Sequence, residues 1–210
     1  MKVFKSFILI VFLITVFSGC SIKKDEVSTM EKIQNQLKNM ESYQCTGTLT
    51  RISNKSENVY EIKQYYKSTG EYKLEMLAPE DVAGNYTVYN GESVFQYNPR
   101  IQGKVIQGVP KSQMRNELFL GCFIKNYFQS EDVTVETGNM DIQKSTVLEA
   151  VIPGENKYTA TEKLWIDEET LKPLKLVIYD TEGKERYIIE YKDFEYNIDI
   201  DENIFKIPEV

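Results

Sequence analysis

Histidine is absent from this 210-residue chain, and its absence excludes a large group of catalytic and metal sites. Serine and cysteine nucleophiles that depend on a histidine base are ruled out, and so is every zinc site with a histidine ligand. An enzyme that uses paired carboxylates remains an alternative, but the acidic residues cluster in predicted turns, as at Asp167, Glu168 and Glu169. We therefore expect a protein that is not an enzyme and that has no cofactor and no metal site.

Cysteine is scarce as well, with three residues in the whole chain. Cys45 and Cys122 lie far apart in apolar patterns and in no metal-binding spacing. Buried free thiols and a disulfide between these two residues both remain open, because a buried cysteine packs like a small hydrophobic side chain.

Basic residues are outnumbered, with 25 lysines and arginines against 32 acidic residues, so the net charge is −7. Proteins bind nucleic acid largely by neutralising phosphates with lysine and arginine. We therefore expect no nucleic-acid partner. Proline is also rare, with six residues, whereas 14 tyrosines and 10 phenylalanines favour one sheet-rich domain.

The N-terminus resembles an export signal. Lys2 and Lys5 give a positive start, residues 7–17 form a short apolar run, and a small Ser-Gly pair precedes Cys20. This arrangement is typical of a signal peptide and not of a membrane-spanning helix. Small residues directly before a cysteine resemble the bacterial lipobox, in which the thiol receives a diacylglyceryl group before cleavage.

The predicted organisation follows from this motif. We expect a lipoprotein signal peptide over residues 1–19, lipidation at Cys20, a tether over residues 20–27 and one folded domain over residues 28–210. The lipid would hold the protein on the outer face of the cytoplasmic membrane. An ordinary signal peptide with an incidental cysteine is the alternative.

An amphipathic helix is predicted directly after the tether. Ser28 and Glu31 have the spacing of a capping box. We expect its apolar stripe to pack against a sheet, with binding to a membrane surface as the alternative. The stripe consists of Met30, Ile33, Leu37 and Met40.

Alternation of apolar and polar residues predicts antiparallel strands through most of the remaining chain. The dipeptide Asn90-Gly91 predicts a tight hairpin, because both of its central positions favour positive φ. Strands are expected at 43–51, 59–67 and 71–78, on both sides of Asn90, and at about 132–137, 145–152, 157–167, 173–180 and 185–194.

Residues 112–132 interrupt this alternation with an apolar helical segment. Apolar residues surround nearly the whole predicted helix, which indicates that it is buried or lies in a groove. Gly121 lowers helix stability, and we expect a break there between two short helices.

The C-terminal third resembles the closing hairpins of the LolA/LolB-like lipoprotein-carrier superfamily. The matching positions there are Trp165, Asp167, Thr170, Pro173, Asp180, Gly183, Phe205 and Pro208. An earlier hairpin is similar to the family's at Gly91, Val94, Phe95, Tyr97, Asn98 and Pro99, with Asn90 in place of the usual acid. The resemblance implies a mainly β (α+β) fold: a highly curved antiparallel half-barrel sheet, with the N-terminal helix and the apolar helical insertion plugging its mouth.

Within this superfamily the chain is similar to the GerS group of germination lipoproteins from spore-forming clostridia. That resemblance implies a partner, a CwlD-like N-acetylmuramoyl-L-alanine amidase, which the lipoprotein would bind and activate for spore cortex modification. It also implies a location in the space between the spore membranes. The alternative function is a lipid or lipoprotein carrier that uses a hydrophobic cavity.

Aromatic residues on the predicted strands are candidates for lining such a cavity, although they could equally form plain core. Exposed strand edges of a half-barrel could also pair between two chains, so a homodimer is possible. The candidate cavity residues are Phe95, Tyr97, Trp165, Tyr187 and Tyr191.

Overall fold

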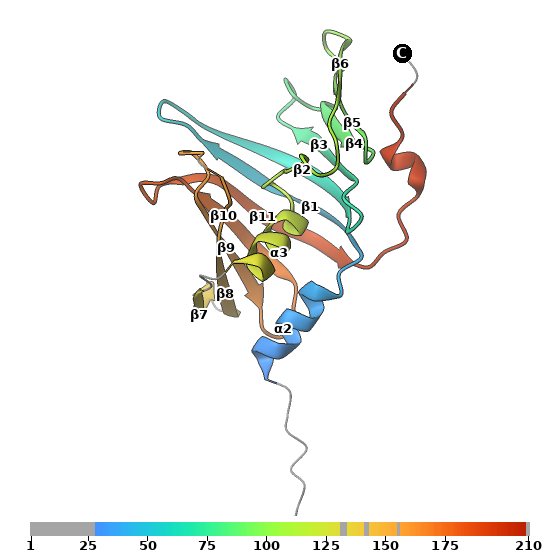
Figure 1. Ribbon diagram of the computed structural model, residues 1–210. Helices are drawn as coiled ribbons and strands as arrows, with labels where there is room; N and C mark the ends of the chain where they lie inside the picture. The colour runs from blue at the N-terminus through green and yellow to red at the C-terminus, as the bar shows by residue number, and fades with distance from the viewer. Residues whose placement is uncertain (1–27, 131–133, 141–142, 155, 209–210) are drawn as a thin grey trace, which may run out of the picture.

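The computed structural model describes residues 28–130, 134–140, 143–154 and 156–208 (Figure 1). The predicted signal peptide, Cys20 and the tether therefore lie outside the described residues. The elements in chain order are α2 (Thr29–Lys38), β1 (Ser42–Ile52), β2 (Glu57–Lys67), β3 (Tyr72–Ala78), β4 (Tyr86–Tyr89), β5 (Ser93–Asn98), β6 (Gly103–Gly108), α3 (Leu120–Gln129), β7 (Thr134–Met140), β8 (Gln143–Val151), β9 (Thr161–Asp167), β10 (Pro173–Tyr179), β11 (Glu185–Tyr196) and the 3₁₀ helix η2 (Glu202–Phe205).

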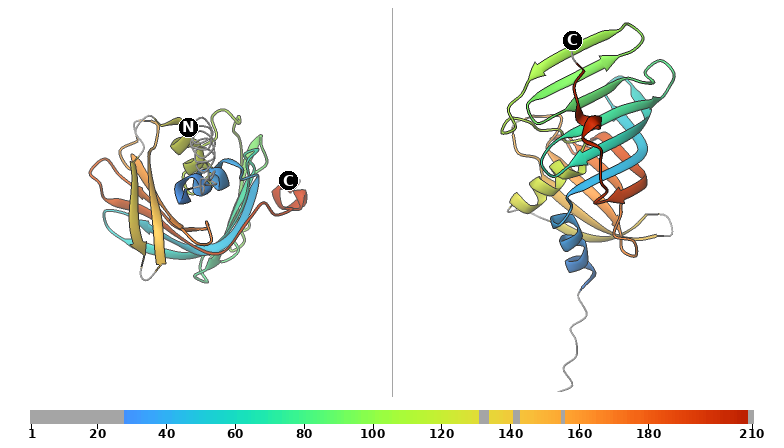
Figure 2. Two further views of the ribbon diagram at one scale, coloured as in Figure 1. Left: turned by 90° about the horizontal axis from the view of Figure 1, so that it is seen from below. Right: turned by 90° about the vertical axis from the view of Figure 1, so that its right-hand side faces the viewer.

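All eleven strands form one antiparallel sheet in the order β6-β5-β4-β3-β2-β1-β11-β10-β9-β8-β7. The first and last strands of the chain pair at its centre, where Gly47 lies opposite Tyr191. The sheet is strongly curved and open, and both α-helices lie on its concave side (Figure 2). The predicted half-barrel is confirmed.

Helix α2 forms where the sequence predicts it. The Ser28 hydroxyl accepts a hydrogen bond from the Glu31 amide at 3.1 Å and so satisfies one free donor of the first turn. Ile33 and Leu37 are fully buried against the sheet, which confirms the packing of the apolar stripe. Among the described residues, no helix has the length and apolar character that crossing a membrane requires.

Helix α3 differs from the prediction at Gly121. One continuous helix begins at Leu120, and residues 109–119 form turns and loop instead of a first short helix. Glycine is needed here for close packing, because a Cβ atom on Gly121 would lie 2.0 Å from the Tyr66 ring. The predicted break is therefore wrong: the glycine lets the start of α3 lie against β2.

The Asn90-Gly91 hairpin is confirmed, and it is followed by a strand that the sequence analysis missed. The Asn90 side-chain oxygen accepts from the Ser93 amide at 2.9 Å, and Gly91 has φ of 96°. Strand β6 then pairs with β5 at one edge of the sheet. Its residues are mostly exposed on both faces, so burial imposes no alternation on its sequence.

The acidic turns of the C-terminal hairpins are structural. Asp167 accepts hydrogen bonds from the amides of Thr170 and Glu169 at 2.6 and 3.0 Å. Asp180 accepts from two amides of its own turn, each at 2.9 Å, and from Arg186 Nε at 2.7 Å. These carboxylates hold turns together and do not converge on a cleft.

Both described cysteines are free thiols, which settles the alternatives for this pair. Cys45 is buried in the main core and Cys122 is half-buried on α3. Burial raises the pKa of the Cys45 thiol well above its ordinary value, and burial raises that of Cys122 to about 11. Both cysteines therefore contribute packing as neutral groups.

Candidate functional site

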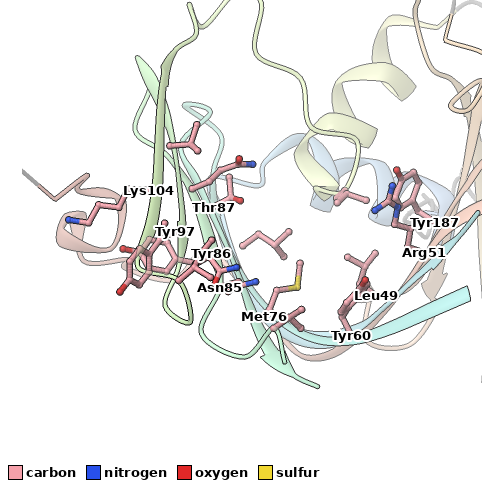
Figure 3. A pocket seen from close by; sticks show the side chains of 18 residues that line it. Leu49, Arg51, Tyr60, Met76, Asn85, Tyr86, Thr87, Tyr97, Lys104 and Tyr187 are labelled. Carbon is pink, nitrogen blue, oxygen red and sulfur yellow. The ribbon is translucent and has the colours of Figure 1, made fainter. Parts of the chain in front are cut away.

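A cavity of about 610 Å³ lies in the N-terminal half of the sheet (Figure 3). It is bounded by β1 to β6, by the turn between β3 and β4, and by the loop that precedes α3. Its volume falls within the ~300–1,000 Å³ that is usual for small-molecule sites. Its apolar and aromatic lining consists of Leu49, Tyr60, Leu74, Met76, Val82, Tyr86, Tyr97, Ile101, Leu118 and Tyr187.

Strand alternation places the apolar part of this lining. Leu74 and Met76 are two positions apart on β3, and successive side chains of a strand point to opposite faces. Both residues therefore face the concave side, where Leu74 also packs into the main core. Leu118 reaches the same space from the loop before α3, so the plugging segment forms one wall of the cavity.

Three polar groups interrupt the apolar lining. Arg51 and Tyr187 are direct cross-strand partners on β1 and β11, and Lys104 lies toward the other end of the cavity (Figure 3). The Asn85 Oδ1 atom is buried and has no hydrogen-bond partner among the described residues. A ligand that fits this lining is mainly apolar, carries an anionic group and has a donor that can reach Asn85.

Two of the five predicted aromatic residues line this cavity. Tyr97 lies beside Tyr86, with ring centroids 5.4 Å apart, and Tyr187 lies at the other end beside Arg51 (Figure 3). Whether a ligand occupies the cavity stays a prediction for both residues.

The other three predicted aromatic residues lie elsewhere. Phe95 is 1% exposed, but its neighbours Val94 and Gln96 face the core and the cavity, so Phe95 is buried on the opposite face of the sheet. Trp165 likewise faces away from the main core and lies under Lys175 Nζ, 5.1 Å from its ring centroid. Tyr191 is part of the main core itself.

Most of the lining escaped the sequence analysis for a simple reason. The analysis selected aromatic residues, whereas Leu49, Leu74 and Met76 provide much of the concave surface. Their alternation marked them as one covered face, but nothing local distinguishes a face that packs tightly from one that borders a cavity.

A buried carboxyl group lies beneath α3, at the other half of the sheet. Glu162 on β9 is completely inaccessible to solvent, and its Oε1 atom accepts a hydrogen bond from Asn126 Nδ2 at 2.6 Å. Its Oε2 atom has no hydrogen-bond partner among the described residues. Burial is the largest cause that raises the pKa of Glu162 to about 7; Glu117 raises it further, whereas the Asn126 hydrogen bond and Arg115 oppose the shift.

This geometry supports binding more than chemistry. The described part of the chain contains no group of three or more cysteine, aspartate or glutamate side chains that could hold a metal ion. Glu162 is sealed beneath α3, and no second carboxyl group shares its site among the described residues. The large cavity has a mainly apolar lining with a few polar groups, which is typical of a ligand-binding surface.

Comparison with known proteins identifies sporulation proteins as relatives. The profile of the family described as sporulation protein YdcC-like matches residues 1–205. Sporulation protein YdcC of Bacillus subtilis (strain 168) is 20% identical over 208 residues, which are 97% of this chain. The chain spans 60% of the length of that relative.

Solved structures extend the comparison. One matching chain comes from the structure of the CwlD amidase from Clostridioides difficile in complex with the GerS lipoprotein. It is 34% identical, has a TM-score of 0.50, and the match covers 86% of this chain and 100% of that one. An uncharacterized conserved protein from Thermus thermophilus has a TM-score of 0.55 at 16% identity, covering 87% and 96% of the two chains, and shows the fold alone.

Proposed function

Because this chain belongs to the YdcC-like sporulation protein family, we propose that it is a lipoprotein that binds and activates a cell-wall amidase of the CwlD type. The observation that carries this proposal is the 34% identity to a chain of the CwlD–GerS complex, over the full length of that chain. The absence of histidine agrees with this role, since the hydrolytic chemistry would reside in the partner.

Reconstitution of the purified full chain with a CwlD-type amidase tests this function. We expect the two proteins to elute together in size-exclusion chromatography, and we expect the amidase to hydrolyse peptidoglycan faster when the chain is present. The Cys20→Ala chain is the matched control, because it lacks the proposed anchor and keeps the folded domain. If neither co-elution nor activation occurs at micromolar concentration, the proposal is wrong.

The membrane anchor is a separate part of the proposal. Support comes from the positive start, the short apolar run and the Ser-Gly-Cys sequence that ends at Cys20. The mature protein would then lie on the outer face of the cytoplasmic membrane, between the membranes of the developing spore. Palmitate labelling of sporulating cells should mark the wild-type chain but not the Cys20→Ala chain, and equal labelling of both would contradict lipidation at Cys20.

A lipid or lipoprotein carrier is the second candidate, and the 610 Å³ apolar cavity supports it. Lipid extracted from the purified chain and identified by mass spectrometry would favour this function. Leu74→Trp would fill part of the cavity and should reduce the lipid recovered per mole of protein. An empty cavity, together with an active amidase complex, would leave the first candidate alone.

A homodimer is a further proposal, supported by the open edges of the sheet at β6 and β7. Light scattering after size-exclusion chromatography measures the mass directly. A mass near the 24.4 kDa of one chain would contradict the dimer.

A further inference from the structure

A second, smaller cavity lies at the start of α3, and we call it the basic pocket. It is bounded by the β2–β3 turn, the loop before α3 and the first turns of that helix, and its volume is about 180 Å³. Its aromatic wall is closely packed: the ring centroids of Tyr72 and Phe119 are 4.5 Å apart, and those of Tyr66 and Phe119 are 6.0 Å apart. One water molecule occupies about 30 Å³ of liquid. The basic pocket therefore accommodates one small polar group and not a lipid.

Three basic side chains converge on this pocket. Lys111, Arg115 and Lys125 all line it, and no described aspartate or glutamate does. This concentration of positive charge is unusual in a chain with 32 acidic and 25 basic residues. In the described part of the chain, neither lysine forms an ion pair.

The arginine is held in place by a buried amide. Asn126 is 3% exposed, and its Nδ2 atom donates to Glu162, which fixes the orientation of the amide. Its Oδ1 atom then accepts a hydrogen bond from Arg115 Nη2 at 3.2 Å. The Glu117 carboxylate lies 3.4 Å from Arg115 Nε and offsets part of its charge. A guanidinium has five N–H donors, so donors remain for a ligand.

The start of α3 adds positive potential to the same pocket. Gly121 and Cys122 in the first turn of this ten-residue helix line the pocket. Phe119 occupies the N-cap position without a side-chain hydrogen bond, and the first turn contains no acidic residue. The partial positive charge of the helix N-terminus is therefore not offset by a local side chain.

We propose that the basic pocket binds a small oxyanion, namely a carboxylate or phosphate group carried by a soluble ligand. The like charges of Lys111, Arg115 and Lys125 repel one another, and an anion between them removes this repulsion. Ammonium and guanidinium groups form their strongest hydrogen bonds with such oxygens. The proposal does not depend on amidase binding or on the content of the large cavity.

Calorimetric titration of the purified full chain with inorganic phosphate and, separately, with acetate tests the proposal. We expect saturable binding that weakens as salt is added, because the lysines are exposed. Lys111→Gln and Lys125→Gln should each weaken binding by about fivefold, the effect of losing about 1 kcal/mol of charge interaction. Both lysines are exposed, so both variants should fold.

Lys55→Gln is the matched control, because it removes the same charge from the exposed β1–β2 turn. Tighter binding of phosphate would identify a phosphate-type ligand, and binding of acetate at least as tight would identify a carboxylate; either result supports the site. Absence of saturable binding of both probes up to about 50 mM would overturn the proposal. Equal weakening by Lys55→Gln would also overturn it, since binding would then reflect net charge alone.

Discussion

Replacing Glu162 with glutamine should make the protein more stable at high pH and remove part of its pH dependence. Glutamine keeps the oxygen that accepts the hydrogen bond from Asn126, but it cannot ionise beneath α3. Burial raises the pKa of Glu162 from 4.5 to about 7 in the folded protein. The unfolded chain exposes this carboxyl group to water, where its pKa returns to the ordinary value.

The size and sign of the effect follow from these two pKa values. Below pH 4.5 the carboxyl group is protonated in both states and does not affect stability. Between pH 4.5 and about 7 only the folded state keeps the proton, so the free energy of unfolding falls by about 1.4 kcal/mol per pH unit. Above pH 7 the loss is complete and amounts to about 3 kcal/mol. Arg115 and Glu117 act on Glu162 in opposite directions and remain in both proteins.

Urea unfolding at pH 5, 6, 7 and 8 measures this difference. The wild-type free energy of unfolding should fall across this range relative to Glu162→Gln, until the variant is more stable by about 3 kcal/mol at pH 8. Glu190→Gln, on the exposed side of β11, should follow the wild type at every pH. Parallel curves for wild type and Glu162→Gln, or a less stable variant at pH 8, would refute the reasoning.

Three other predictions concern packing, capping and thiol reactivity. Gly121→Ala should lower the free energy of unfolding by about 1–3 kcal/mol, because its methyl group would overlap the Tyr66 ring; Gly108→Ala, which meets nothing within 4 Å, is the control, and equal stability of the two variants by urea unfolding would contradict the packing. Ser28→Ala should cost about 1 kcal/mol through loss of the α2 cap, and an unchanged midpoint of thermal unfolding would show that this cap contributes nothing. Cys45 should resist iodoacetamide at pH 8 in the native protein and react once urea unfolds it, because burial keeps its thiol protonated; rapid modification of the native protein, seen by peptide mass mapping, would be inconsistent with the buried position.

The family and the main elements were readable from the sequence because their signals are local. The Ser28 cap, the alternation in β1 to β3 and the Asn90-Gly91 turn each depend on neighbours within a few residues. Such local preferences agree with the final fold here, as is usual for sequences that fold to one structure. The resemblance then supplied the global shape that no single element specifies.

The positions of the candidate sites were decided by the tertiary structure. Alternation identifies two faces of a strand, but which face becomes concave depends on how the whole sheet curves and on where α2, α3 and the C-terminal segment pack. Phe95 and Trp165 are therefore plausible cavity residues in sequence and lie on the other face in the fold. The burial of Glu162 is likewise produced by a helix 36 residues away in the chain, through Asn126. Contacts of this kind join residues that are distant in sequence, and for that reason only the packed structure reveals them.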